Sequence, residues 1–78
     1  MSDLEKYNHA CTEAFGVGEN ELASLKYQGV ASWDSVGHMN LIGELEDAFD
    51  IEMETDDVIG FSSYEKGREI LKKYGIEI

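Results

Sequence analysis

Apolar residues recur at helical spacing in this chain, and the strongest such stretch, residues 34–49, does most to constrain the fold. Its apolar residues make one broad face of a helix: Val36, Met39, Leu41, Ile42, Leu45, Ala48 and Phe49. No proline occurs in the chain, and no repeat or low-complexity tract interrupts the pattern. The sequence therefore predicts an all-α fold.

An earlier helix is predicted over residues 2–15. Ser2 or Asp3 can cap its start, and Gly16 follows its last residue. One apolar stripe marks the face expected to enter the core: Leu4, Tyr7, Cys11, Ala14 and Phe15. Cys11 is the only cysteine, so no disulfide forms within the chain, and we expect it to be an ordinary buried residue.

Two more helices are predicted after residue 50. A short one fits residues 55–59, with Thr55 as its cap, and a longer one runs from residue 62 or 63 to 74, where Gly75 ends it. The inward face of the longer helix is expected to hold Tyr64, Ile70, Leu71 and Tyr74. With 78 residues, the chain is expected to be a single domain, residues 1–78, folded as a small four-helix bundle of three main helices and a short one.

A long connection, residues 17–33, joins the first two helices. Its apolar residues are irregularly spaced, although residues 21–25 fit a short turn of helix. A connection of this length in a small domain either packs its own side chains or serves a function.

Acidic residues dominate the charge of the chain. It carries 17 acidic and 6 basic side chains, for a net charge of −11. No lysine or arginine lies between Lys26 and Lys66, and nine acids fall in the stretch from Asp34 to Asp57. Such a charge disfavours nucleic acid and anionic membrane surfaces as partners. The acidic stretch fits either a solvated face or a docking surface for basic partners.

Neither a membrane span nor a secretory signal is predicted. No apolar run approaches the ~20 residues that a span needs. The N-terminal residues lack a basic region followed by an apolar stretch. We therefore expect a cytoplasmic monomer that does not bind membranes.

Ser35 is the residue with the clearest chemical potential. It follows Asp34 at the start of an amphipathic helix, where free backbone N–H groups and the helix dipole favour a phosphate ester. A loop edge also leaves a serine accessible to a modifying enzyme. On spacing alone, a simple helix cap is the preferred interpretation of Asp34 and Ser35.

The motif Asp34-Ser35-Val36 at the head of this helix resembles the acyl carrier protein family, whose second helix opens on Asp-Ser followed by an apolar residue. The likeness extends along the helix and the loop beyond it: Leu41-Ile42, Leu45-Glu46-Asp47 and Phe49-Asp50-Ile51-Glu52-Met53. It is specific over residues 33–58 and covers the whole chain in helix number and length.

The resemblance implies a carrier that performs no catalysis. Ser35 would bear a 4′-phosphopantetheine arm, taken from coenzyme A on a phosphopantetheinyl transferase, and Asp34 would position the serine. The thiol of the arm would carry acyl cargo as a thioester to acyl-loading and acyl-processing enzymes with basic patches. The residues expected to dock these partners are Val36, Met39, Glu44, Glu46, Asp47, Asp56 and Asp57.

Two departures from the family pattern indicate a specialised stand-alone carrier. Carriers of fatty acid synthesis have acids where this chain has Gly37 and Asn40, and an apolar-Pro-Asp sequence where it has Met53-Glu54-Thr55. A glycine in the first turn of a helix lowers the stability of the helix by about 1 kcal/mol relative to alanine. We expect Gly37 to be tolerated because it lets the arm or a partner approach closely.

Other chemistries fit the sequence less well. Asp34, Ser35 and His38 are too close along one helix to form a hydrolase triad with a separately oriented base. A calcium loop beginning at Asp50 would need glycine and glutamate where Thr55 and Phe61 stand. Zinc spacing is absent from His9, Cys11 and His38, so no specific metal site is expected, and the acidic side chains are expected at most to bind divalent cations weakly and diffusely. The open alternative is an acidic helical interaction module that is never modified.

Overall fold

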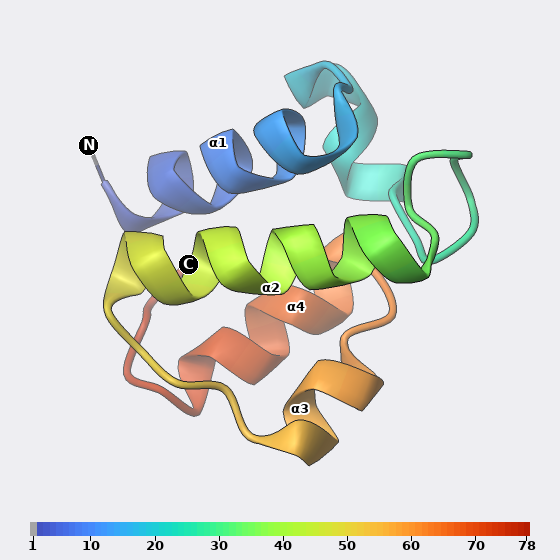
Figure 1. The fold of residues 1–78 in the computed structure, drawn as a ribbon. Coiled ribbons are helices and arrows are strands. Elements are labelled where there is room, and N and C mark those ends of the chain that lie inside the picture. Colours follow the sequence, from blue (N-terminus) through green and yellow to red (C-terminus); the bar gives the residue numbers. More distant parts are fainter. Residues whose placement is uncertain (1) are drawn as a thin grey trace.

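The computed structural model describes residues 2–78 and contains the helices α1, η1, α2, α3 and α4 in that order (Figure 1). α1 spans Asp3–Phe15, the 3₁₀ helix η1 spans Glu19–Ser24, α2 spans Ser35–Phe49, α3 spans Thr55–Gly60 and α4 spans Tyr64–Lys72. Within residues 2–78 the domain is all-helical, as the periodicity predicts. None of the helices in this range combines the length and the apolar character required to cross a membrane.

Side-chain caps begin α1 and α4 at the predicted serines. Ser2 Oγ accepts the backbone N–H of Glu5 at 3.2 Å, and the Glu5 carboxylate accepts the Ser2 N–H in return at 3.3 Å. The Ser63 hydroxyl accepts a backbone N–H of the first turn of α4 at 3.0 Å. α3 differs from the prediction: Glu54 holds the cap position without a side-chain hydrogen bond, and Thr55 is already helical.

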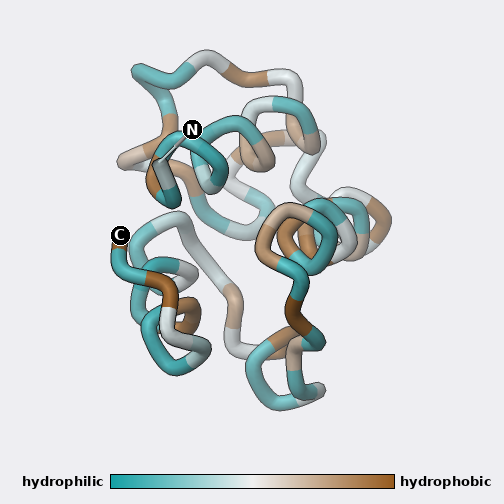
Figure 2. Tube along the Cα trace, turned by 90° about the vertical axis from the view of Figure 1, so that its left-hand side faces the viewer, coloured by the Kyte–Doolittle hydropathy of each residue, from teal (hydrophilic) through white to brown (hydrophobic). Residues whose placement is uncertain are grey.

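The core lies between α1, α2 and α4. α1 and α2 run side by side in opposite directions (Figure 1), and α4 packs on α1 where the rings of Tyr7 and Tyr64 stack. Hydrophobic and hydrophilic residues both occur within the helical turns (Figure 2), as expected for helices that bury one face. The largest fully buried side chains are Trp33, Tyr7, Phe61, Leu41, Leu45, Leu71 and Cys11. Cys11 is buried in the core, as predicted, and burial raises the pKa of its thiol to about 12.

Three apolar residues of the predicted stripes lie outside the core. Leu4 is 40% exposed in the first turn of α1, and on α2 Val36 and Met39 are 71% and 57% exposed. The reason on α2 is that its inward face is set by four other residues: Gly37, Leu41, Ile42 and Leu45. Positions 36 and 39 point away from that face, because successive residues of a helix turn by about 100°.

Gly37 has a packing role that the sequence does not reveal. A Cβ at this position would lie 1.9 Å from the backbone carbonyl oxygen of Ser32, at the end of the long connection. The connection therefore packs directly on the first turn of α2. This contact, rather than access for an arm or a partner, explains the glycine.

The long connection packs its own side chains into the core, which is one of the two roles predicted for it. Leu22 and Leu25 are buried beside α1 and α4. The Leu25 carbonyl oxygen accepts the Tyr64 N–H at 2.9 Å, and the Tyr27 N–H donates to the Ser62 carbonyl oxygen at 2.8 Å. These two hydrogen bonds fasten the connection to the junction between α3 and α4.

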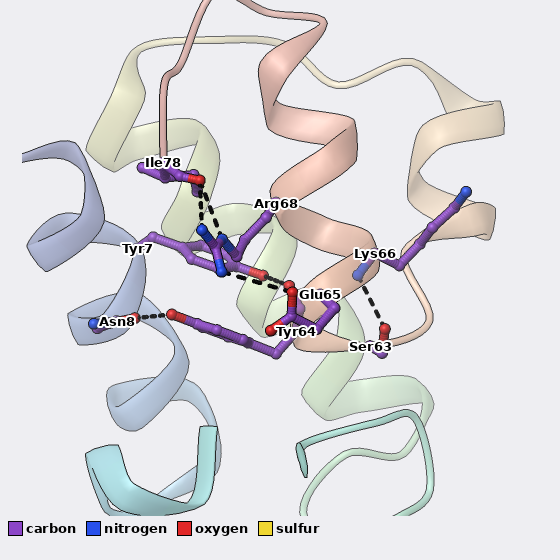
Figure 3. Close-up of polar contacts among 8 residues, drawn as sticks. All are labelled: Tyr7, Asn8, Ser63, Tyr64, Glu65, Lys66, Arg68 and Ile78. Carbon is purple, nitrogen blue, oxygen red and sulfur yellow. Dashed lines mark hydrogen bonds and ion pairs between the residues drawn. The ribbon is translucent and has the colours of Figure 1, made fainter. Parts of the chain in front are cut away.

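Tyr7 joins α1 to α4 at the centre of the core (Figure 3). Its hydroxyl donates to the Tyr64 carbonyl oxygen at 2.6 Å, and the two rings stack with centroids 4.8 Å apart. Burial raises the pKa of Tyr7, so its hydroxyl stays protonated and remains a donor. α4 approaches this closely at Gly67, where a Cβ would lie 2.3 Å from the Tyr7 hydroxyl oxygen and 2.2 Å from the Phe61 ring.

We predict that Gly67→Ala strongly destabilises the domain. The added methyl group would force apart Tyr7 and Phe61, and overpacking of this kind costs about 1–3 kcal/mol or more of the free energy of unfolding. Urea unfolding followed by circular dichroism measures the effect. The matched control is Gly43→Ala on α2, where a Cβ would meet nothing within 4 Å. Alanine there should be neutral or stabilising, and equal losses in both variants would contradict the close approach at Gly67.

Candidate functional site

Ser35 is the first residue of α2, and its side chain is exposed. Asp34 is the helix cap: its Oδ1 accepts the backbone N–H of Gly37 at 2.9 Å. The cap fixes the turn from which Ser35 projects, and it keeps a carboxylate beside the serine. The hydroxyl of Ser35 therefore lies on the surface at the positive end of the helix.

A groove of about 440 Å³ opens beside Ser35, between α2, α3, the junction of α3 with α4, and Tyr27 of the long connection. Its wall is largely apolar, with Met39 from α2 and Val58 and Ile59 from α3. The complete lining is Tyr27, Ser35, His38, Met39, Val58, Ile59, Phe61 and Ser62. Ligand sites commonly combine such an apolar wall with a few polar groups.

The imidazole of His38 links three segments around the groove. Its Nδ1 lies 3.0 Å from the indole Nε1 of Trp33, and its Nε2 lies 2.7 Å from the carbonyl oxygen of Val58. Because the indole N–H can only donate, Nδ1 must accept and carries no proton. Nε2–H then donates to Val58, which defines the neutral tautomer.

His38 is consequently not a general base for Ser35. Both of its ring nitrogens are engaged by other partners, and the carboxylate of Asp34 serves as the helix cap. The triad that the sequence analysis set aside is therefore not formed.

Tyr27 is a site residue that the sequence analysis missed. Its hydroxyl lies 3.4 Å from Ser35 Oγ, and its ring packs edge-on against Trp33 and His38 at centroid distances of 6.4 and 5.6 Å. The residue belongs to the irregular connection, and only the folded chain brings it to the head of α2. Its aromatic character in a polar loop was the one signal available from the sequence.

Five of the residues expected to dock partners are exposed: Val36, Met39, Glu44, Asp47 and Asp56. Ile59, which the sequence analysis did not single out, is 75% exposed and lines the same groove as Ser35. Apolar and acidic side chains are therefore available together on α2 and α3. Although acids are crowded here, residues 2–78 contain no group of three or more His, Cys, Asp or Glu side chains arranged to hold a metal ion.

The other two expected docking acids have structural contacts instead. Glu46 is half-buried, and its carboxylate accepts the Met53 N–H at 2.9 Å, which orders the loop after α2. Asp57 is buried and accepts from Lys73 Nζ at 2.6 Å and from the Tyr74 hydroxyl at 2.5 Å. These hydrogen bonds, chiefly that from Lys73, lower the pKa of the Asp57 carboxyl. Contrary to the expectation of an exposed docking acid, Asp57 is buried and holds α3 to the end of α4.

Comparison with known proteins assigns no family. The chain matches no protein-family model, and comparisons with curated proteins and with solved structures also give no match. The function must therefore be argued from the geometry around Ser35.

We predict that Asp34→Ala destabilises the domain, whereas Asp34→Asn largely does not. Alanine removes the acceptor for the Gly37 N–H and should lower the free energy of unfolding by about 0.5–2 kcal/mol. Asparagine caps helices about as well as aspartate but carries no charge. Urea unfolding of both variants separates the cap from the charge, and wild-type stability in the alanine variant would show that the cap does not hold this turn.

Proposed function

We propose that the protein is a carrier, similar to acyl carrier proteins, that holds cargo as a thioester on a 4′-phosphopantetheine arm attached to Ser35. One observation carries the proposal: Ser35 is an exposed hydroxyl at the first residue of an amphipathic helix, next to an apolar groove. Exposure supports access for a transferase, and the helix end supports a phosphate ester.

Attachment would occur on a separate phosphopantetheinyl transferase. Ser35 Oγ attacks the phosphorus of coenzyme A that bears pantetheine, and an Oγ–P bond forms. The bond from this phosphorus to the oxygen bridging to the adenosine bisphosphate breaks, and that leaving group keeps the electron pair. The proton of the serine passes to a base of the transferase, because His38 is engaged with Trp33 and Val58.

The surroundings of Ser35 fit such an arm and its cargo. Ser35 is itself part of the groove lining, so a group esterified to Oγ starts at the groove. Met39, Val58 and Ile59 supply apolar surface that can contact an acyl chain. The thiol of the arm supplies the thioester chemistry, and the protein supplies attachment and surface.

Partner enzymes would dock on the exposed residues of α2 and α3. Glu44, Asp47 and Asp56 offer charge to a basic patch, while Val36 and Met39 offer apolar contact beside Ser35. Asn40 is exposed where carriers of fatty acid synthesis have an acid, which supports a specialised pathway. The partners proposed are the transferase and the acyl-loading and acyl-processing enzymes of that pathway.

Intact-mass spectrometry after incubation with coenzyme A and a broad-specificity transferase tests the proposal. We predict that the wild-type chain gains one phosphopantetheine and that Ser35→Ala gains none. Ser62→Ala is the matched control, because Ser62 is also exposed and lines the same groove. It should be modified like wild type. A wild-type chain that gains no mass would favour the alternative, an acidic helical interaction module that is never modified.

Charge reversal on α2 should weaken docking to the same transferase. We predict that Glu44→Lys and Asp47→Lys each raise the KM for the carrier several-fold, with a smaller change in kcat, because exposed charges act mainly on encounter. Raised salt should narrow the difference from wild type. Glu77→Lys, an exposed acid after α4, is the control of equal charge change. Equal effects from all three variants would indicate net charge rather than a docking face on α2.

A further inference from the structure

The Tyr27 hydroxyl, 3.4 Å away, is the one side-chain partner of Ser35 Oγ among the hydrogen bonds of residues 2–78. We infer that Tyr27 binds the phosphate ester formed at Ser35 and thereby keeps the arm at the groove. The inference rests on the proposed function and makes Tyr27 a positioning residue.

The backbone holds Tyr27 in place before any modification. Its N–H donates to the Ser62 carbonyl oxygen at 2.8 Å, and the preceding Lys26 forms an antiparallel bridge with Ser63. The following residue, Gln28, has a left-handed φ of 63° and donates its N–H to the Trp33 carbonyl oxygen at 2.9 Å. A non-glycine residue keeps such a conformation where its surroundings fix it.

The ring of Tyr27 is also fixed by its contacts. It lies edge-on to the buried Trp33, with an interplanar angle of 84°, and to His38, at 82°. Since His38 is itself bonded through both ring nitrogens, this packing directs the phenol toward the head of α2. The hydroxyl is therefore oriented in advance, which lowers the entropy lost on binding.

The chemistry of the pair changes when Ser35 is esterified. In the free chain either hydroxyl can donate, and 3.4 Å is long for an O–H···O hydrogen bond, which is normally about 2.7–2.8 Å. Esterification removes the serine proton and adds phosphate oxygens that only accept. Tyr27 then becomes the donor to a charged acceptor that extends beyond Oγ. Such charge-assisted bonds are shorter and stronger than neutral ones.

The groove gives this contact a consequence. Tyr27 and Ser35 line it together with Met39 and Ile59, the two most exposed apolar residues of the lining. A phosphate held by Tyr27 keeps the arm beside this apolar surface, whereas a free phosphate lets the arm swing into solvent. Tyr27 would therefore set the fraction of time that the arm and its cargo lie against the groove.

Phosphorus-31 NMR of the modified chain tests the inference without any enzyme activity. In wild type we expect a broad, shifted phosphodiester signal, because the held phosphate tumbles with the domain. In Tyr27→Phe the signal should narrow and move toward that of free pantetheine phosphodiester, with the ratio of held to free phosphate about tenfold lower, as expected on losing one hydrogen bond to a charged group. Amide spectra of the phenylalanine variant check that the ring packing is kept.

Ser62→Ala is the matched control, because it removes another hydroxyl from the same lining. It should leave the phosphorus signal as in wild type. A modified Tyr27→Phe chain with the wild-type shift and line width would overturn the inference while the proposed function stands. A wild-type chain that takes no arm would overturn both.

Discussion

The hydrogen bonds of His38 are the contacts on which the site depends. His38 belongs to α2. Its Nδ1 bonds to Trp33, at the end of the long connection, and its Nε2 bonds to Val58 in α3. A typical hydrogen bond contributes only about 1 kcal/mol to the free energy of unfolding, but these two position α2 and α3 on either side of the groove. Trp33 is anchored in turn by stacking on the buried Phe15, with ring centroids 4.6 Å apart.

This arrangement favours presentation of Ser35 over activation of it. A nucleophilic serine needs a base that is free to take its proton and an acid that orients the base. Here the His38 imidazole is hydrogen-bonded to Val58 in α3, and the Asp34 carboxylate caps α2. The serine is exposed beside an apolar surface, which supports the proposal that another enzyme acts on it.

The sequence predicts the helices well because their signals are local. Ser2 and Ser63 cap α1 and α4, and the apolar period of α2 gives its length. The residues that escaped prediction depend on tertiary contacts. Gly37 meets Ser32 only in the folded chain, and Val36 lies at the surface because other residues of α2 form its buried face.

The same limit applies to the site. Ser35 and Asp34 could be found from their place before an amphipathic helix, which is a property of adjacent residues. Tyr27 could not, because it lies eight positions before Ser35, in an irregular part of the chain. Asp57 was misjudged because the sequence shows its charge and not its bonds to Lys73 and Tyr74.

Nitrogen-15 NMR of the His38 ring at neutral pH tests most directly whether His38 holds the site together. The hydrogen bonds to Trp33 and Val58 predict a neutral ring with its proton fixed on Nε2. A proton on Nδ1, or free exchange between the two tautomers, would contradict this role of His38.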